Sequence, residues 1–449
     1  MKIHFIGIGG IGVSALAQYY LEKGHEISGS DLFSSEITDF LKNRGVKITI
    51  GNLPENISKD MNLVIYSPAV EKKNPELLKA RKYNIKIMSY PEALGKLTEQ
   101  YFTIAIAGAH GKSTTTAMIG LILQKAGLDP TVIVGTKLKE FGGSNFKMGK
   151  SRYLVIEACE YDSSFNNYSP KITVVTNIDK EHLDYFKSLK NIISIFRSFI
   201  LKLQEDGFLV ANEDDKNISK VLKSKFLIPN KFSIVKFSIK QKEAKELKKI
   251  LKIPGQHNIY NALAALTVAR VLEIPDEVSF KALSQYRGSW RRFEVKTAEL
   301  TRLPAGRQGT SRRKTREITV VSDYGHHPTE IKATLQSARE KYPKKKIWCI
   351  FQPHQYQRTY YLFKDFVRVF RKVPVDNVMI TDIHDVAGRE EKKISSSVNS
   401  KNLVKKIKRK NVKYFSVNEA EKYVKENIKS GEVLIIMGAG DIYKLVEKF

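Results

Sequence analysis

The chain of 449 residues has only two cysteines and no long apolar run. Cys159 and Cys349 lie far apart, so the sequence contains no disulfide framework and no C-x-x-C metal pair, and we expect both thiols to be buried. No stretch approaches the roughly 18 apolar residues that a membrane helix needs, and the first residues lack the pattern of a signal peptide. These absences argue against a disulfide-stapled secreted scaffold and against a membrane protein, and they predict a cytoplasmic location.

Acidic residues are also scarce, because 47 Asp and Glu stand against 76 Lys and Arg, giving a formal net charge of +29. Such an excess is typical of proteins that bind nucleic acid, since Lys and Arg contact phosphates. The lysines are spread over segments such as 72–86, 242–252 and 404–413, which favours solvated helix faces, and no known nucleic-acid motif accompanies them. We expect no nucleic-acid partner, and a nucleic-acid-binding ATPase is the distant alternative.

Length and hydrophobic content predict about three folded domains. Hydrophobic residues make up 42% of the chain, and domains commonly contain about 150 residues. Apolar strands alternate with helical stretches throughout, which is typical of α/β folds with mostly parallel sheets. We place a Rossmann-like domain at residues 1–97, a central phosphate-loop domain at 98–290 and a second Rossmann-like domain at 291–449.

One segment of the third domain departs from this pattern. Residues 296–317 contain Pro, Gly and many basic side chains, and they show neither helical nor strand periodicity. We interpret the segment as an exposed insertion in a loop or hairpin. A nucleic-acid patch is the less favoured interpretation.

The most informative motif is a glycine turn that follows the apolar run 103–107 and leads into a helix. Backbone N–H groups and the positive end of a helix dipole attract phosphate oxygens at such a turn. Lys112 can bridge the outer phosphates, and the Ser113 hydroxyl can hold Mg²⁺ on the nucleotide. The usual loop has a glycine where this chain has Ile106, so the motif is the shorter G-x-x-G-K-[ST] form. The predicted ATP-binding residues here are Gly108, Ala109, His110, Gly111, Lys112, Ser113 and Thr114.

A second glycine turn, GIGGIG, follows the first predicted strand at residues 7–12. Gly9, Gly10 and Gly12 can bring the backbone close to a pyrophosphate, and Asp31 ends the next strand, where an acidic side chain can bind a ribose hydroxyl. The sequence therefore predicts two nucleotide sites.

Acidic side chains follow two further strands of the central domain. The strand 153–157 ends on Glu157, with Glu160 and Asp162 just beyond it, and the strand that begins at residue 172 is followed by His182. Ligands of open α/β sheets bind outside the carboxyl ends of the strands, so we predict Glu157 and His182 as metal ligands at neighbouring strand ends. A solvent-facing histidine at a helix start is the alternative interpretation of His182.

Asn258 and Asn261 lie three residues apart at the start of an apolar helix. One of them is expected to be an N-cap. The paired amides can also hydrogen-bond an adenine edge, which carries a donor and an acceptor side by side.

These motifs, together with several in the third domain, resemble the Mur ligase family along essentially the whole chain. The residues that carry the resemblance are GIGGIG (7–12), GAHGKSTT (108–115), EACEYDSSF (157–165), TNIDKEHLDYF (176–186), PGQHNIYNALAA (254–265), RGSWRRFE (287–294), DYGHHPTEI (323–331), FQPHQYQRT (351–359) and MGAGDI (437–442). The resemblance implies an N-terminal domain that binds a UDP-sugar, a central ATPase and a C-terminal domain that binds an amino acid.

The resemblance also implies a reaction, in which ATP drives ligation of L-alanine to the lactyl carboxylate of UDP-N-acetylmuramate through an acyl phosphate. The implied partners are therefore small molecules, and two Mg²⁺ ions are the implied cofactors. The runner-up activity within the family is ligation of a murein tripeptide during peptidoglycan recycling.

Residue roles follow from the same resemblance. Lys112, Glu157, His182, His326 and Arg358 are implied as catalytic, with Ser113, Glu157 and His182 as metal ligands. Asn258, Asn261, Arg292 and Asp323 are implied at ATP, and Gly9, Gly10, Gly12, Asp31 and Ser67 at the UDP-sugar. Tyr324, His326 and Arg358 are implied to orient the amino acid.

The chain departs from the family pattern at three positions. Ser322 stands where the family commonly has the first Asp of a D-D-Y triplet, Cys159 where Asp is usual, and Gln355 where Arg is frequent. A neutral amide at position 355 removes a fixed positive charge, which puts a carboxylate or phosphate contact there in doubt.

Overall fold

The computed structural model describes residues 1–223, 232–301, 315–385 and 392–449. These residues form two compact units. The first unit comprises Met1–Asp179, Lys190–Ile250 and Tyr260–Tyr286, and the second comprises Lys180–Leu189, Leu251–Ile259 and Arg287–Phe449. Within the described residues, no helix is both long enough and apolar enough to cross a membrane.

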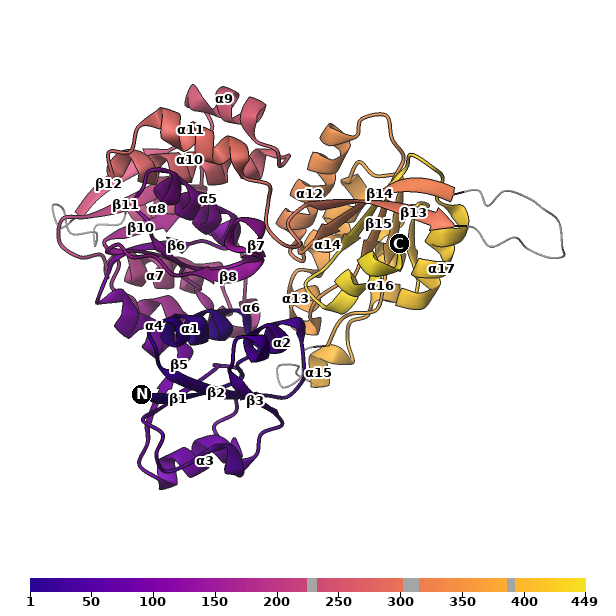
Figure 1. Cartoon of the computed structure of the whole chain (residues 1–449). Coiled ribbons are helices and arrows are strands. Elements are labelled where there is room, and N and C mark those ends of the chain that lie inside the picture. The colour runs from indigo at the N-terminus through magenta and orange to yellow at the C-terminus, as the bar shows by residue number, and fades with distance from the viewer. Residues whose placement is uncertain (224–231, 302–314, 386–391) are drawn as a thin grey trace. The chain divides into compact units, whose positions relative to one another are not determined.

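The N-terminal sheet has five parallel strands in the order β3-β2-β1-β4-β5 (Figure 1). The strands are β1 (Lys2–Ile6), β2 (Glu26–Asp31), β3 (Lys47–Ile50), β4 (Leu63–Tyr66) and β5 (Lys86–Ser89), and the helices are α1 (Ile11–Glu22), α2 (Glu36–Asn43), α3 (Pro75–Lys82) and α4 (Tyr90–Thr98). β1 pairs with both β2 and β4, so the turn after β1 lies where the strand order reverses. Open α/β sheets bind ligands at this position, and the predicted Rossmann-like fold is confirmed.

The second sheet of this unit has seven strands in the order β12-β11-β10-β6-β9-β7-β8. They are β6 (Phe102–Ala107), β7 (Thr131–Leu138), β8 (Ser144–Lys147), β9 (Tyr153–Glu157), β10 (Ile172–Val175), β11 (Gly207–Asn212) and β12 (Phe232–Phe237). The helices along this stretch are α5 (Lys112–Lys125), α6 (Leu183–Phe186), α7 (Leu189–Ile200), α8 (Lys216–Leu222), α9 (Glu243–Ile250), α10 (Gln256–Val271) and α11 (Asp276–Gln285). Only the β7–β8 pair is antiparallel. β6 is central, so the loop that follows it lies between strand ends on both sides.

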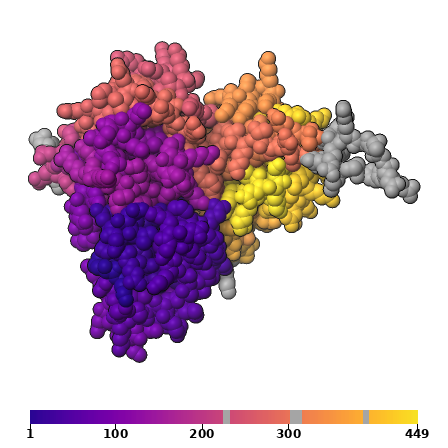
Figure 2. Space-filling model, in the orientation of Figure 1, coloured from indigo at the N-terminus to yellow at the C-terminus, as the bar shows by residue number. Residues whose placement is uncertain are grey.

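The two sheets of the first unit are joined by a buried polar network between α1 and the β7–β8 hairpin. Gln18 Nε2 donates to Asn145 Oδ1 (2.8 Å), and Ser144 Oγ donates to Gln18 Oε1 (2.9 Å). Tyr19 packs edge-on against Phe146 beside this network, with ring centroids 6.4 Å apart. The indigo and purple surfaces accordingly adjoin in Figure 2. Satisfied buried polar networks fix one arrangement of the elements that they join, so the two glycine turns of this unit are held in a defined relationship.

The third sheet lies in the second unit and has the order β13-β14-β18-β15-β16-β17. Its strands are β13 (Glu294–Thr301), β14 (Thr315–Asp323), β15 (Ile347–Phe351), β16 (Asn377–Ile380), β17 (Val412–Tyr414) and β18 (Val433–Met437), and its helices are α12 (Pro328–Lys341), α13 (Tyr356–Tyr361), α14 (Phe363–Lys372), α15 (Lys392–Ser395), α16 (Ser400–Ile407) and α17 (Val417–Asn427). β13 and β14 form an antiparallel hairpin, and the other pairs are parallel. Alternate residues of β15 enter separate apolar clusters, Cys349 in one and Trp348 in the other, because successive side chains point to opposite faces of a strand. The predicted α/β architecture with three mostly parallel sheets is therefore confirmed, whereas the domain boundaries near residues 97 and 290 stay predictions.

The segment 296–317 belongs to a hairpin, which is one of the two settings expected for it. Residues 296–301 and 315–317 lie in the paired strands β13 and β14, and the central part, 302–314, lies outside the described residues. Two other local expectations were wrong. Neither asparagine of α10 is an N-cap, because the helix begins at Gln256. Cys159 is exposed rather than buried, because it lies beyond the end of β9, while Cys349 is buried as expected.

Candidate active site

The phosphate loop connects β6 to α5 and depends on two glycines. Gly108 has φ of +144° and Gly111 has φ of +84°, values that side chains rarely adopt. A Cβ on Gly108 would lie 2.0 Å from Thr176 Oγ1, and one on Gly111 would lie 2.3 Å from Asn261 Oδ1. Both positions therefore require glycine for the backbone angle and for the close packing of neighbouring side chains.

The residues after β10 hold this loop in place. The His110 N–H donates to Asn177 Oδ1 (2.9 Å), and Asn177 Nδ2 donates to the His110 carbonyl (2.9 Å). Thr176 Oγ1 also donates to the His110 carbonyl (2.7 Å), and the His110 ring lies 3.3 Å from the Asp179 carboxylate. The loop is therefore preorganised by its own domain, which lowers the cost of fixing it around a ligand.

The Lys112 ammonium is folded back onto the loop and paired with an acidic side chain. Lys112 Nζ donates to the Gly108 carbonyl (2.5 Å) and lies 2.9 Å from Glu160 Oε2. Burial is the largest single influence and lowers the pKa of Lys112, but the charge and hydrogen bond of Glu160, together with the negative charges of Cys159 and Glu157, raise that pKa overall. Lys112 is thus a fixed positive charge within the phosphate loop.

Glu157 ends β9 beside this charge. Its carboxylate accepts a hydrogen bond from the Gly135 N–H of β7. Its negative charge also contributes to the raised pKa of Lys112, so the two side chains interact. The prediction for Glu157 and His182 assumed that β9 and β10 are neighbouring strands. This was wrong, because β6 lies between them.

The first glycine turn is built around Asp31 and Tyr90. The Gly9 N–H donates to Asp31 Oδ2 (2.8 Å), so one carboxylate oxygen of Asp31 supports the turn itself. A Cβ on Gly12 would lie 2.7 Å from the Tyr90 hydroxyl. Burial, and then the charge of Glu157, raises the pKa of Tyr90, so the phenol that packs against the first glycine turn is also near enough to Glu157 to be affected by its charge.

Ser67 follows β4 on the other side of the same turn. A Cβ on Gly7 would lie 2.9 Å from Ser67 Cβ, so the two backbones approach closely there. The structure therefore brings together Asp31, Ser67 and the predicted glycines at the carboxyl end of the first sheet. Their contact with a UDP-sugar stays a prediction.

The two asparagines of α10 are both buried and both engaged with the protein. Asn258 Nδ2 donates to the Pro254 carbonyl (2.7 Å), and Asn261 Oδ1 accepts from Thr115 Oγ1 (3.3 Å). Asn261 therefore supports the first turn of α5. Asn258 belongs to the second unit and Asn261 to the first, and their role at adenine stays a prediction.

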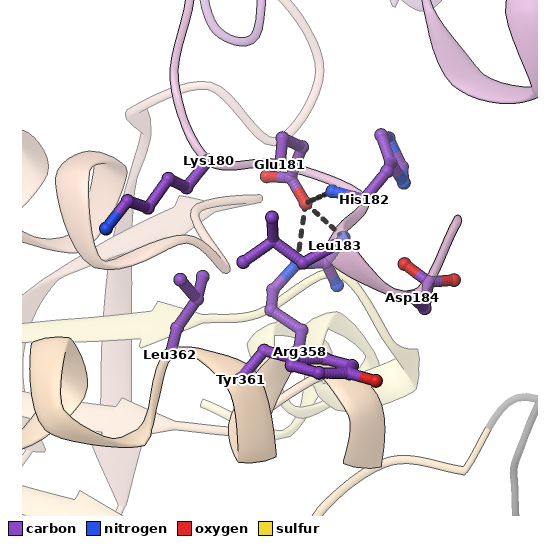
Figure 3. A pocket seen from close by; sticks show the side chains of 8 residues that line it. All are labelled: Lys180, Glu181, His182, Leu183, Asp184, Arg358, Tyr361 and Leu362. Carbon is purple, nitrogen blue, oxygen red and sulfur yellow. Dashed lines mark hydrogen bonds and ion pairs between the residues drawn. The ribbon is translucent and has the colours of Figure 1, made fainter. Parts of the chain in front are cut away.

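In the second unit, Arg358 of α13 forms a buried ion pair with Glu181. Arg358 Nε and Nη2 lie 2.9 and 2.8 Å from Glu181 Oε1, and Nη1 donates to the His354 carbonyl (2.5 Å). Burial is the largest single influence and raises the pKa of Glu181, but the charge of Arg358, together with those of nearby histidines, holds that pKa well below its usual value. Figure 3 shows Arg358 pointing toward Glu181 within a small pocket. The residues that line the pocket are Lys180, Glu181, His182, Leu183, Asp184, Arg358, Tyr361 and Leu362.

His182 is partly exposed at the start of α6, with a left-handed backbone (φ 53°). It lines the same pocket as Arg358. Glu157 belongs to the first unit and His182 to the second, so the predicted metal-ligand pair stays a prediction.

His326 and Tyr324 follow β14 near the Glu181–Arg358 pair. His326 Nδ1 lies 3.1 Å from the Tyr324 carbonyl and 3.3 Å from Glu330 Oε2, so Nδ1 carries the proton and donates. Burial lowers the pKa of His326 to about 4. The imidazole is therefore neutral near pH 7, which leaves Nε2 as a hydrogen-bond acceptor.

Arg292 and Asp323 lie at the same end of the third sheet. The Arg292 guanidinium stands 4.8 Å from the centre of the Tyr324 ring, which is a cation–π distance. Asp323 Oδ2 accepts from the Phe293 N–H (2.9 Å), and Oδ1 accepts from the Gly325 N–H (2.8 Å) and from Thr334 Oγ1 (3.1 Å). Asp323 therefore organises the loop that presents Tyr324 and His326, and its predicted contact with ATP stays a prediction.

Two of the positions that depart from the family pattern are buried. Ser322 pairs with Glu294 across the β13–β14 hairpin and is 4% exposed. Gln355 is the N-cap residue of α13, and its carbonyl accepts a hydrogen bond from Thr359 Oγ1 (2.8 Å). A neutral side chain suits both of these buried positions.

Sequence reasoning missed three residues that shape the site. Glu160 was noted only as one of several acids, and Glu181 and Tyr90 were given no role. Glu160 lies in the segment 157–165, which contains several polar side chains, and this is only a weak signal for a role of any one of them. Four strands, β2 to β5, lie between Gly12 and Tyr90 along the chain, so no local sequence pattern could have indicated their contact.

The fold and these groups define a class, an α/β nucleotide-binding enzyme with a phosphate loop in its central sheet and a second glycine turn in an adjoining sheet. Three family models match the chain: the "Mur ligase family, catalytic domain" at residues 2–102, the "Mur ligase middle domain" at 106–269 and the "Mur ligase, glutamate ligase domain" at 306–440.

Relatives match over nearly their full length. A UDP-N-acetylmuramate--L-alanine ligase from Clostridium kluyveri is 38% identical over 467 residues, covering 100% of this chain and 97% of the relative. One from Alkaliphilus metalliredigens is 40% identical over 471 residues, covering 99% and 96%. The chain belongs to the Mur ligase family.

Solved structures agree with this assignment. The crystal structure of UDP-N-acetylmuramate-alanine ligase from Thermotoga maritima has a TM-score of 0.77 at 26% identity, with 100% of this chain and 98% of that chain covered. A murein peptide ligase from Psychrobacter arcticus has a TM-score of 0.72 at 22% identity, with 100% and 98% covered, and shares the fold.

Proposed function

We propose that this protein joins L-alanine to the lactyl carboxylate of UDP-N-acetylmuramate and cleaves ATP to ADP and phosphate. The observation that carries the proposal is that the two glycine turns lie in one unit, where a buried polar network joins the two sheets that bear them. A sugar nucleotide at the first turn and ATP at the second would bring a carboxylate toward a γ-phosphate. The names of the full-length relatives support the choice of L-alanine.

The chemistry follows from the low reactivity of a carboxylate. The lactyl carboxylate attacks the γ-phosphate to form an acyl phosphate, and the amine of alanine then displaces phosphate. Phosphoryl transfer is catalysed mainly by positioning and charge neutralisation. Lys112 would neutralise the transferred phosphate, and the amides of residues 108–114 would hold the other phosphates.

The residues beside the phosphate loop fit a Mg²⁺ ion. Ser113 and Glu157 offer oxygen atoms, which are the ligands that Mg²⁺ prefers. Bound there, the ion would neutralise charge on the nucleotide phosphates. His182 would hold a second ion near the acyl phosphate, although imidazole is a less common ligand for Mg²⁺ than oxygen.

The residues of the third sheet would bind the amino acid. The neutral His326 can accept a hydrogen bond from the alanine ammonium at Nε2, and Arg358 and Tyr324 supply donors for a carboxylate. Arg292 and Asp323 would contribute to ATP, as would Asn258 and Asn261 at adenine. ATP and UDP-sugars are substrates found inside cells, so we place the reaction in the cytoplasm.

A phosphate-release assay tests the proposal. The wild-type chain should release phosphate with ATP, Mg²⁺ and UDP-N-acetylmuramate only when L-alanine is added. Faster release with the tripeptide L-alanyl-γ-D-glutamyl-meso-diaminopimelate than with alanine would replace the proposal with the recycling activity. ATP hydrolysis that depends on nucleic acid and not on the UDP-sugar would replace it with a different class of enzyme.

A further inference from the structure

The ammonium of Lys112 has its hydrogen-bonding capacity occupied within the protein. Glu160 Oε2 lies 2.9 Å and Oε1 3.3 Å from Lys112 Nζ, and the carbonyls of Gly108 and Ala109 lie 2.5 and 3.4 Å away. An ammonium has three protons to donate. A phosphate oxygen can therefore bind Lys112 only by displacing one of these partners.

Glu160 is held in place by an unusual turn. Asp162 (φ 51°) and Ser163 (φ 55°) follow it with consecutive left-handed backbones, a conformation that costs energy for residues other than glycine. The Ser163 N–H donates to the Glu160 carbonyl (2.9 Å), and the same turn contains Phe165, which stacks on Phe199 with ring centroids 4.3 Å apart. Such strain persists only where the surroundings enforce it, and it is common at functional sites.

Glu160 is also buried, at 1% exposure, and the phosphoryl-transfer chemistry proposed above gives it no role. A buried carboxylate next to the phosphate loop repels the phosphates of a nucleotide and attracts the same ammonium that they need. The Glu160–Lys112 pair and a Lys112–phosphate pair are therefore competitors.

We propose that Glu160 is a positioning residue that holds the Lys112 ammonium until a nucleotide binds and then releases it to the phosphates. The proposal rests on the proposed function, because it takes the loop to be the ATP site. Part of the nucleotide's binding free energy is spent on breaking the Glu160–Lys112 pair. Glu160 thereby weakens nucleotide binding and favours release of ADP.

The test is ADP affinity, measured by calorimetry with Mg²⁺ and again with EDTA. Glu160→Gln keeps the shape of the side chain and removes its charge, so the variant should bind ADP about tenfold more tightly under both conditions. Asp162→Asn is the matched control, because it removes the same charge two residues away from an exposed side chain, and it should leave ADP affinity within twofold of the wild type.

A double-mutant cycle shows whether the effect acts through Lys112. In a Lys112→Met background, Glu160→Gln should tighten ADP binding much less than in the wild type, because only the direct repulsion between Glu160 and the phosphates is then relieved. Tightening of equal size in that background would overturn the proposal. If Glu160→Gln does not fold, Glu160→Asp serves in its place, since it draws the carboxylate back by one methylene and should tighten ADP binding to a smaller extent.

Other results would also overturn the proposal. Weaker ADP binding by Glu160→Gln with Mg²⁺, but not with EDTA, would make Glu160 a metal ligand. Unchanged affinity in both conditions, with lowered thermal stability, would make the pair purely structural. ADP binding needs no ligase turnover, so a failure here is distinct from a failure of the alanine assay.

Discussion

The side-chain amide of Asn177 forms two hydrogen bonds with the main chain of His110, one as acceptor and one as donor, each 2.9 Å long. The pair closes the phosphate loop against the residues that follow β10, so the conformation of the loop does not depend on a bound nucleotide.

Asn177→Leu should therefore weaken ATP binding. Two hydrogen bonds contribute about 2 kcal/mol together, which corresponds to a roughly 30-fold rise in the KM for ATP. Steady-state kinetics with varied ATP measures the change. Binding of UDP-N-acetylmuramate in the absence of ATP serves as the control and should keep its wild-type affinity, because the first glycine turn has its own supports. An unchanged KM for ATP would show that the loop does not need this clamp.

Gly12→Ala should disturb the first glycine turn through Tyr90. The added methyl carbon would lie 2.7 Å from the Tyr90 hydroxyl, so the phenol or the turn must move. We expect a loss of at least tenfold in affinity for UDP-N-acetylmuramate, measured by calorimetry. In a Tyr90→Ala background, Gly12→Ala should lower the affinity for UDP-N-acetylmuramate by less than it does in the wild type, because the side chain that the methyl group would meet is gone. An equal loss in both backgrounds would mean that the methyl group acts on the ligand and not on Tyr90.

Lys112→Ala should abolish product formation, because the charge that neutralises the transferred phosphate is removed. Binding of UDP-N-acetylmuramate should survive, since the first glycine turn is separate from the loop. Chromatographic detection of the ligated product measures the first effect, and calorimetry measures the second. Retained ligation would mean that the triphosphate is bound elsewhere.

Two partly buried histidines should make the second unit sensitive to acid. Burial lowers the pKa of His326 to about 4 and that of His354 to about 2. In the unfolded chain an imidazole has a pKa of about 6.5, so protonation favours unfolding as the pH falls below this value. The stability from keeping these groups neutral is present above pH 6.5. Each histidine should lower the free energy of unfolding by about 2 kcal/mol between pH 7 and pH 5.

Fluorescence in urea measures this dependence, because both tryptophans of the chain, Trp290 and Trp348, belong to the second unit. His326→Gln should show a smaller loss of stability between pH 7 and pH 5 than the wild type. Equal losses in the two proteins would refute the assignment of His326 as a partly buried group that stays neutral in the folded protein.

Local patterns in the sequence were sufficient for the glycine turns and the fold class. Lys112 and the loop around it follow an apolar strand and precede a helix, and all the necessary signals lie within a dozen residues. Glu160 lies 48 residues from Lys112, and Glu181 lies 177 residues from Arg358, so their pairing depends on strand order. No pattern in the sequence places β6 between β9 and β10.

Short edge strands were missed for a related reason. β3 has four residues and β17 has three, too few for a clear alternation of apolar and polar side chains. The outer part of the β13–β14 hairpin has no recognisable strand pattern, because charged residues such as Arg316 and Glu317 lie within β14. Sequence patterns reveal strands mainly through burial, and the outer part of this hairpin is not deeply buried.

The segment 302–314 should be dispensable for catalysis. Thr301 and Thr315 are register partners in the β13–β14 hairpin, so an Asn-Gly link between them matches the two-residue turn that connects antiparallel strands. The variant in which Asn-Gly replaces residues 302–314 should keep kcat and each KM within about twofold of the wild type, because no proposed site residue lies in the segment.

The replacement also removes Arg302, Arg307, Arg312, Arg313 and Lys314. RNA-binding measurements at low salt provide the second readout, and they should show little binding by either protein. A large loss of activity with an unchanged circular dichroism spectrum would give the segment a role in the reaction, and binding of RNA by the wild type alone would make it a nucleic-acid patch.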